Sequence, residues 1–408
     1  MKSFEIPSKY RSGYIGRIKS HFKISDPRKQ NLSPAILNFG SFSLILPRHF
    51  GFCYGVENAI EIAYRAIDQN PGKRIFLISQ MIHNPLVNQD LLDLGVRFLM
   101  DTDGSQIIGW SELKPDDIVV TPAFGTTVEI EAILRATGVN IEEYNTTCPF
   151  VEKVWKRSNE IGTNGYTVLI HGKAKHEETR ATFSHATKGS PSIVVRNMAE
   201  AQWLGEMLIG QRSLEEFYSL FEGKYSEGFD PKRDLERLGV VNQTTMLATE
   251  TQEIADYFKS VMCQLHGENY KAYFADTRDT LCYATNDNQD ATKALLSCGA
   301  DMALVIGGYN SSNTAQIHTI LQSVFPSFFI SGAESVLSKD SLRHYLYDQQ
   351  KEVETEWMTK SAHPIIILTS GASCPDKVVD EVMMKIKSLF PNSVETDVVF
   401  DDFIKQKI

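Results

Sequence analysis

From residue 42 onward the chain alternates short β-rich runs with stretches whose apolar residues recur at helical spacing. This alternation is typical of parallel α/β units, because a parallel strand needs a crossover connection and a helix usually provides it. A chain of 408 residues is too long for one small core and predicts two or three packed units. We predict strands at residues 42–46, 74–78, 117–121, 166–170, 193–196, 239–242, 271–274, 302–306, 327–330 and 365–369.

Short polar loops follow many of these predicted strands directly. In open α/β sheets, ligands bind beyond the carboxyl ends of the strands, so a binding site is expected among these loops. Taken singly, His83 is more typical of a turn residue and Ser311 of a helix cap. The polar side chains of these loops include His83, His176, Glu177, Glu178, Gln243, Thr244, Ser311, Ser312, Asn313 and Ser373.

Cys53, Cys148 and Cys282 each lie on a turn between a predicted strand and a predicted helix. Six cysteines in a chain of this length are too few for a disulfide scaffold and indicate reduced thiols. Cys263 and Cys298 fall inside helical patterns, where a buried, inert thiol is the expected interpretation.

The chemistry of the three loop cysteines leaves alternatives open. A structural zinc site usually has four ligands at closer spacing, and a disulfide would leave the third cysteine unpaired. A [4Fe-4S] cluster held by three thiolates leaves one iron open to a substrate. Unrelated buried or loop cysteines are the simpler alternative.

The charge of the chain bears on its partners. The formal net charge is −10, so no overall positive field favours nucleic acid or an anionic membrane. No apolar run approaches the roughly 18 residues that a membrane span requires. We therefore expect a small-molecule substrate, with no nucleic acid and no membrane as partner.

Residues 1–41 lack periodicity and contain only two acidic residues, Glu5 and Asp26. This composition resembles an organelle transit peptide, so a plastid location is an alternative to the cytoplasm that we expect. The simpler interpretation is a poorly ordered or surface-draped extension, of which Ile15, Phe22 and Ile24 could still dock.

Residues 207–236 interrupt the α/β pattern. A stretch rich in Gly, Asp, Pro and Lys lies at 228–233. We interpret this segment as a surface insertion.

Eight short motifs occur in a fixed order. They are GFCYGV at 51–56, HNP at 83–85, TCP at 147–149, HEE at 176–178, QTT at 243–245, CYAT at 282–285, NSSN at 310–313 and GAS at 371–373. As an ordered set over residues 43–400, they resemble the 4-hydroxy-3-methylbut-2-enyl diphosphate reductase family, in its plant and cyanobacterial branch.

The resemblance implies a fold of three parallel-sheet α/β units arranged with pseudo-threefold symmetry around a central iron-sulfur cluster. The corresponding domains are residues 42–147, 148–277 and 278–408, after the extension 1–41. The implied cofactor is one [4Fe-4S] cluster with Cys53, Cys148 and Cys282 as ligands. The fourth iron is left to the substrate.

The resemblance also implies the reaction and its residues. The family reductively removes the allylic hydroxyl of its substrate and forms isopentenyl and dimethylallyl diphosphates, with ferredoxin or flavodoxin as the expected electron donor. Glu178 and Thr244 are the implied catalytic residues near the hydroxyl. Thr244 is also an implied substrate-binding residue. The implied diphosphate contacts are His83, His176, Ser311, Ser312, Asn313 and Ser373.

Two positions depart from the family pattern. Phe124 stands where much of the family has a histidine, and Cys374 replaces a small residue beside Ser373.

Two alternative functions are weighed against this family. An iron-sulfur protein that only senses redox state or carries electrons would not need the His, Ser and Asn loops. A zinc hydrolase using His83, His176 and Glu178 would leave the cysteines unexplained.

Overall fold

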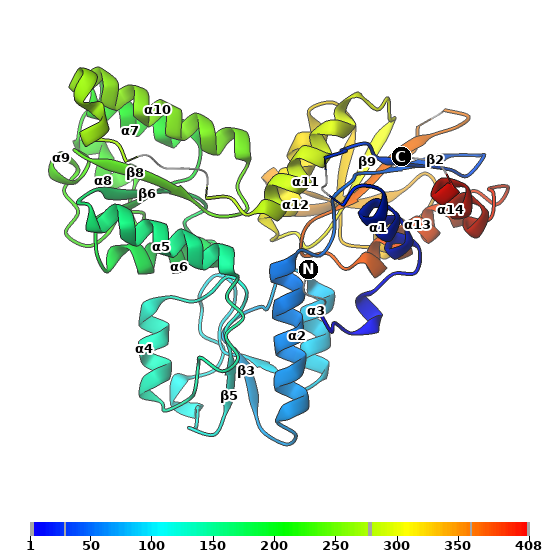
Figure 1. Cartoon of the computed structure of the whole chain (residues 1–408), viewed down its shortest axis with the longest axis horizontal. Coiled ribbons are helices and arrows are strands. Elements are labelled where there is room, and N and C mark those ends of the chain that lie inside the picture. Colours follow the sequence, from blue (N-terminus) through cyan, green and yellow to red (C-terminus); the bar gives the residue numbers. More distant parts are fainter. Residues whose placement is uncertain (1–3, 28–29, 276–279, 360, 406–408) are drawn as a thin grey trace. The chain divides into compact units, whose positions relative to one another are not determined.

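The computed structural model describes residues 4–27, 30–275, 280–359 and 361–405 (Figure 1). The chain divides into two compact units. The first comprises Met1–Glu57, His83–Leu86 and Tyr283–Ile408, and the second comprises Asn58–Ile82 and Val87–Cys282. No helix in the described ranges is long and apolar enough to cross a membrane.

The first unit is built on a seven-stranded sheet. Its four central strands are parallel, and strands at both edges pair antiparallel. In sheet order the strands are β1 (Ala35–Asn38), β2 (Ser43–Leu46), β13 (Ile365–Ser370), β9 (Met302–Ile306), β10 (Ser327–Ile330), β11 (Leu342–Leu346) and β12 (Lys351–Thr355).

Helices cover both faces of this sheet, because alternate residues of the buried strands point to opposite faces. On one face Leu304 and Ile306 pack with α1, α13 and α14; on the other, Ala303 and Val305 pack with α12. The helices of the unit are α1 (Tyr14–Ser25), α11 (Tyr283–Lys293), α12 (Ser312–Gln322), α13 (Asp376–Ser388) and α14 (Thr396–Lys405).

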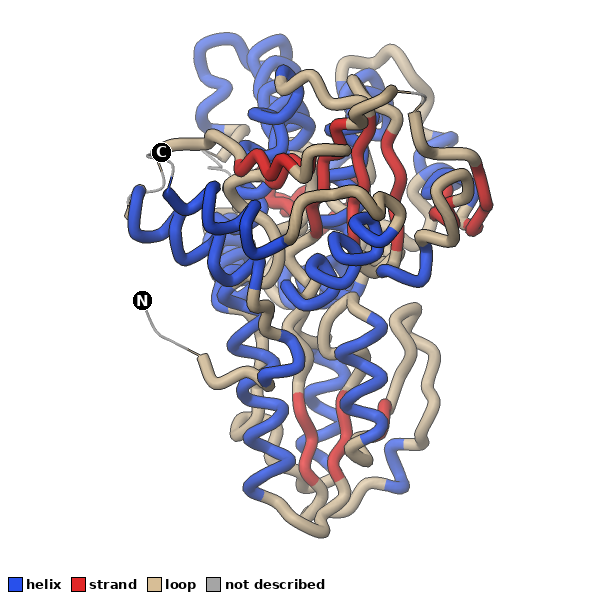
Figure 2. The backbone as a smooth tube through the Cα atoms, turned by 90° about the vertical axis from the view of Figure 1, so that its right-hand side faces the viewer, coloured by secondary structure: helices blue, strands red, loops and turns tan. Residues whose placement is uncertain are grey.

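The described part of the second unit contains two three-stranded parallel sheets. One has the order β4 (Arg97–Phe98), β3 (Ile75–Leu77) and β5 (Ile118–Val120). The other has the order β7 (Ser192–Val195), β6 (Thr167–His171) and β8 (Leu238–Asn242). Figure 2 shows the short strands of the first of these sheets as red segments between helices.

Helices also cover both faces of the β7-β6-β8 sheet. In Figure 1, α7 and α10 lie on one side of β6 and β8, and α5 and α6 lie on the other. Two helices, α2 (Tyr54–Gln69) and α3 (Pro85–Asp93), begin in the first unit and continue in the second. The remaining helices are α4 (Val128–Ala136), α5 (Pro149–Thr163), α6 (Glu177–Thr187), α7 (Met198–Leu208), α8 (Glu215–Leu220), α9 (Pro231–Asp234) and α10 (Ala248–His266).

The N-terminal segment is not draped over the surface. Helix α1 buries Ile15, Ile18 and Phe22 in the core of the first unit, at intervals of three and four residues that place them on one helix face. Ile24, by contrast, is exposed. The expectation of a poorly ordered or surface-draped extension is therefore wrong for helix α1, while the docking expected of Ile15 and Phe22 is confirmed.

Two further expectations need correction. Residues 207–236 are not a purely surface insertion, because Phe217, Phe221 and Phe229 are buried against the β7-β6-β8 sheet. The first half of the strand predicted at 271–274 belongs to a 3-10 helix, Gly267–Ala272, and Phe274 makes only an isolated bridge to Leu238. Its aromatic residues, Tyr273 and Phe274, have strand propensity, but they pack on the core just after the 3-10 helix and form no strand.

Candidate active site

In the first unit, Cys53 lies on the turn between β2 and α2. Its backbone N–H donates to the carbonyl of Ala372 at 3.2 Å, and Ala372 lies on the loop after β13. The two loops meet because β2 and β13 are adjacent parallel strands whose carboxyl ends share one sheet edge. The Cys53 side chain is half-buried.

The loops after β9 and β13 meet at the same edge, because Ile306 and Ser370 are paired in register. Ser373 donates to the carbonyl of His83 at 3.1 Å, and the hydroxyls of Ser373 and Ser311 lie 3.4 Å apart. His83, Ser311 and Ser373 are all buried. The first unit thus brings His83, the 310–313 motif and Ser373 together, and all three were predicted to contact the diphosphate.

Helix α12 begins inside this group of loops. Ser311 is its N-cap and accepts from Thr314 N–H, while Asn313 Oδ1 accepts from Ala372 N–H at 2.8 Å. Ser312 Oγ and Asn313 Nδ2 are buried, and within the described part of the chain neither has a hydrogen-bond partner. Two buried polar groups without partners at a helix N-terminus are suited to an anionic ligand.

Two glycines allow these loops to approach each other closely, a role that the family motifs did not predict for them. A Cβ on Gly371 would lie 1.9 Å from Thr314 Oγ1, and one on Gly308 would lie 2.4 Å from the His83 carbonyl oxygen. A side chain at either position would push the loops apart. A glycine directly beyond a predicted strand was the available signal for both.

In the second unit, Cys148 is the N-cap residue of α5, and its N–H donates to the carbonyl of Ala123 at 3.0 Å. The N–H of Cys282 lies 3.4 Å from the carbonyl oxygen of Thr244. Burial raises the pKa of Cys148 to about 12, and repulsion from Cys282 and Glu178 adds to that shift. Cys148 therefore lies within electrostatic range of both groups.

Glu178 lies in the first turn of α6 and is buried. Its carboxylate accepts from Thr244 N–H at 2.5 Å. This contact forms because β6 and β8 end in register, with His171 opposite Asn242. Burial raises the pKa of Glu178 to about 7, against the opposing effect of hydrogen bonds from Thr244. The carboxyl can therefore hold a proton near neutral pH.

His176 is the N-cap residue of α6. Its Nδ1 accepts from the N–H of Glu178 at 3.2 Å, so the proton of the neutral ring lies on Nε2. The ring of Phe124 meets the imidazole edge-on, with centroids 5.6 Å apart. Phe124, which replaces the histidine common in the family, thus packs against a predicted substrate-binding residue.

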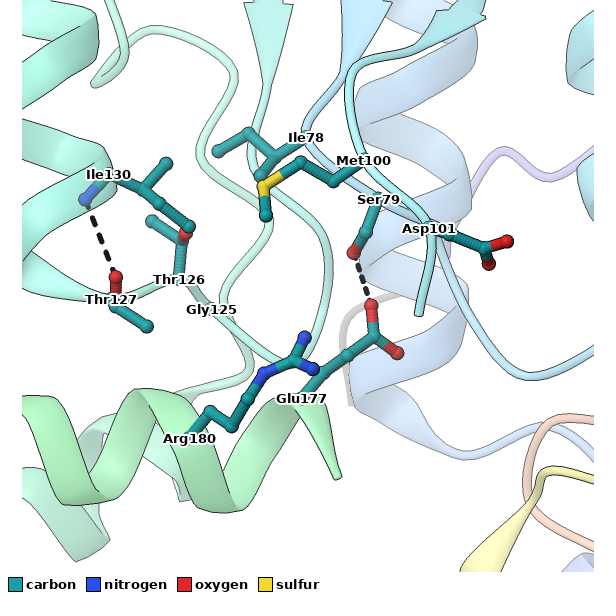
Figure 3. Close-up of a pocket in the computed structure, with 10 residues that line it drawn as sticks. All are labelled: Ile78, Ser79, Met100, Asp101, Gly125, Thr126, Thr127, Ile130, Glu177 and Arg180. Carbon is teal, nitrogen blue, oxygen red and sulfur yellow. Dashed lines mark hydrogen bonds between the residues drawn. The ribbon is translucent and has the colours of Figure 1, made fainter. Parts of the chain in front are cut away.

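The neighbouring Glu177 has different surroundings (Figure 3). It accepts a hydrogen bond from Ser79 and lines a cavity of about 50 Å³ together with Arg180 and Asp101. That volume holds one or two water molecules and is too small for a diphosphate substrate. Of the adjacent pair, Glu178 is the residue that accepts from the Thr244 N–H.

Cys374 follows Ser373 on the loop after β13. Its side chain is fully buried in the hydrophobic core of the first unit, where burial raises the pKa of its thiol. Neither unit contains, among its described residues, a group of three or more metal-ligating side chains already close enough to hold an ion.

Comparison with known proteins identifies the family. A family model described as LytB protein matches residues 44–387. A protein from Trichodesmium erythraeum named 4-hydroxy-3-methylbut-2-enyl diphosphate reductase is 36% identical over 355 residues, which cover 86% of this chain and 86% of that protein. The chain belongs to the LytB family. The predicted resemblance is confirmed.

Further LytB relatives agree with this assignment. A protein of the same name from Trichormus variabilis is 37% identical over 386 residues, covering 94% of this chain and 91% of the other. The solved structure of the E-1-hydroxy-2-methyl-but-2-enyl-4-diphosphate reductase from Plasmodium falciparum matches with a TM-score of 0.61 and 20% identity. It covers 86% of this chain and 90% of that one, which shows a shared LytB fold.

Proposed function

We propose that the protein is a 4-hydroxy-3-methylbut-2-enyl diphosphate reductase, the enzyme of the last step of the non-mevalonate isoprenoid pathway. Its place in the LytB family supports this activity. The observation in this structure that carries the proposal is the buried carboxyl of Glu178, which is fixed by Thr244 in the same unit as Cys148 and Cys282.

The donor set fits an iron-sulfur cluster. Cys148, Cys282 and Glu178 interact electrostatically in a buried region, where a thiolate is disfavoured unless positive charge compensates it. We assign Cys53, Cys148 and Cys282 as the ligands of one [4Fe-4S] cluster. When bound, this cluster would supply electrons and Lewis acidity.

The reaction consumes two electrons and two protons. The allylic carbon–oxygen bond breaks, the oxygen leaves as water, and a new carbon–hydrogen bond gives isopentenyl or dimethylallyl diphosphate. Glu178 is suited to deliver a proton to the leaving hydroxyl, because burial keeps its carboxyl protonatable near neutral pH. The Thr244 N–H holds the carboxylate in place through this transfer.

The diphosphate is assigned to the polar loops. Ser312 Oγ and Asn313 Nδ2 have no partners within the described residues and can bind phosphate oxygens, beside Ser311, Ser373 and His83. His176 would donate from Nε2, because its Nδ1 is occupied by the α6 cap. An iron-sulfur protein that only carried electrons would have no use for these groups. We take ferredoxin or flavodoxin as the electron donor.

Anaerobic purification tests the proposal directly. The protein should be brown, contain about four irons per chain as expected for one [4Fe-4S] cluster, and convert the allylic alcohol diphosphate to both products with a reduced viologen dye as artificial reductant. A colourless protein after anaerobic reconstitution, or a brown protein that forms neither product, would contradict it.

A further inference from the structure

The N-terminal segment, residues 4–25, is anchored within the first unit. Asp380 of α13 accepts hydrogen bonds from the Ser12 hydroxyl and from the N–H groups of Tyr14 and Ile15. These bonds satisfy donors at the start of α1. The buried face of α1 and this cap together fix the segment on the core.

The same segment contacts the turn that carries Cys53, on both sides of the cysteine. Before it, the rings of Tyr10 and Phe52 meet edge-on with centroids 6.1 Å apart. After it, the rings of Phe4 and Tyr54 do so at 4.9 Å. Phe4 is buried although it lies near the start of the described chain. Edge-to-face aromatic pairs of this kind add stabilisation beyond the area they bury.

A third contact reaches the glycine of the turn. Lys19 forms an ion pair with Asp376 at 2.6 Å, and its Nζ lies 4.8 Å from the ring centroid of Phe50. A Cβ on Gly51 would lie 2.5 Å from Asp376 Oδ1 and 2.7 Å from Lys19 Nζ, and Gly51 has φ of 74°. The turn therefore runs directly over this ion pair, in a conformation that favours glycine.

Phe4 and Lys19 also line the same hollow as Cys53. This hollow has a volume of about 390 Å³ and lies wholly within the first unit. N-terminal residues thus form part of the wall of the hollow from which solvent reaches the half-buried thiol of Cys53.

We propose that the N-terminal segment is a brace for the Cys53 turn: Phe4, Tyr10 and Lys19 hold the backbone on either side of the cysteine and thereby slow loss of the iron that it binds. These three side chains are positioning residues, since they act through the turn. The inference rests on the proposed function in one respect, namely that Cys53 is an iron ligand.

The test compares a Phe4→Ala/Tyr10→Ala double variant with Tyr14→Ala. Tyr14 is an aromatic residue of the same segment, but its ring packs on Phe400 of α14, away from the turn. The readout is anaerobic release of iron from the loaded protein to a chelator, followed by absorbance. We expect release about three- to tenfold faster in the double variant, as for the loss of two aromatic contacts, and unchanged release in Tyr14→Ala.

A second readout needs no cluster. In the metal-free full-length chain, the rate at which iodoacetamide alkylates Cys53, measured by peptide mass spectrometry, should rise in the double variant, while the rates at Cys148 and Cys282 stay constant. Lys19→Met should have the same effect more weakly. If the wild type binds no cluster, the proposed function fails while alkylation still tests the brace. Equal Cys53 alkylation in the double variant, Tyr14→Ala and the wild type would overturn the brace.

Discussion

At the scale of single residues, Glu177 and Glu178 are adjacent but bond to different groups, Ser79 and Thr244. Glu178→Gln keeps the shape and hydrogen-bonding capacity of the side chain while removing its transferable proton. Turnover should therefore fall by at least ~100-fold, as for loss of a general acid, with cluster content and substrate binding retained. The measurement is single-turnover reduction of the allylic alcohol diphosphate with excess artificial reductant.

Glu177→Gln is the matched control, because Glu177 is also buried and accepts its hydrogen bond from Ser79. Its turnover should stay near that of the wild type. Near-normal product formation by Glu178→Gln would show that the proton comes from elsewhere, for instance from the diphosphate of the substrate.

His171 provides a prediction on pH and stability. Burial lowers the pKa of His171 to about 4, because the ring is fully buried, and a hydrogen bond with the backbone of Arg196 opposes this shift only in part. The unfolded chain then binds this proton at higher pH than the folded chain does. Between pH 6.5 and pH 4 the folded state should lose about 3 kcal/mol of stability from this group.

The comparison with His171→Asn isolates that contribution. Asn can keep a hydrogen bond to the Thr251 hydroxyl, which lies 3.0 Å from His171 Nδ1, and it does not titrate. Glu178 has a raised pKa and acts in the opposite direction over part of this range, so the difference between the two proteins is the informative quantity. Denaturant unfolding at pH 7 and pH 5 should show a smaller loss in His171→Asn; parallel losses would refute the assignment.

At the scale of elements, two neighbouring serines at the start of α12 should affect different properties: Ser312 the binding of substrate and Ser311 the stability of the fold. Ser312 Oγ is buried without a partner in the described structure, so Ser312→Ala should leave thermal unfolding nearly unchanged. It should weaken substrate binding about tenfold if the hydroxyl contacts a phosphate oxygen. Calorimetric titration of the loaded protein with substrate measures this.

Ser311→Ala is the complementary variant. Ser311 caps α12 through Thr314 N–H, and losing such a cap typically costs about 1 kcal/mol of stability. We therefore expect a lower unfolding temperature for Ser311→Ala and not for Ser312→Ala. Identical affinity in Ser312→Ala and the wild type would mean that the diphosphate binds elsewhere.

At the scale of the whole molecule, one cluster should depend on cysteines from distant parts of the chain. Replacing Cys53, Cys148 or Cys282 by Ser should each abolish stable iron binding and activity. Cys263→Ser and Cys298→Ser are the controls, since both residues are half-buried and have no assigned role. The measurement is the iron and sulfide content of each variant after anaerobic reconstitution. A Cys148→Ser protein with a full complement of iron would show that Cys148 is not a ligand.

Some parts of the fold can be predicted from the spacing of apolar and polar residues within one short segment. The buried parallel strands were found because continuous apolar runs and the polar loops after them are visible in the sequence. The residues proposed for the site were chosen from those loops and from the family motifs. The contact of Glu178 with Thr244 needed the pairing of β6 with β8, which no local pattern contains.

Other features depend on partners far along the chain. The apolar face of α1 is buried only because α13 and α14 pack against it, and these helices lie far along the chain. Its own sequence therefore resembled an unstructured extension. The aromatic residues at 217–229 pack from a short helix and loops, where no helical or strand period can develop. The glycines that let loops touch were visible only as possible turns.

The seven-stranded sheet draws its strands from both ends of the chain, and this bears on the order of folding during synthesis. Residues 58–282 lie largely in the second unit, so that unit can fold soon after it leaves the ribosome. Strand β2 must wait for β13, its neighbour, and the Cys53 turn must wait for Ala372. In a released fragment that ends just after Cys282, we expect the second unit to resist protease while the first fifty residues are still cleaved. Cys53 would thus be the first of the three thiols to be made and the last to reach its final position.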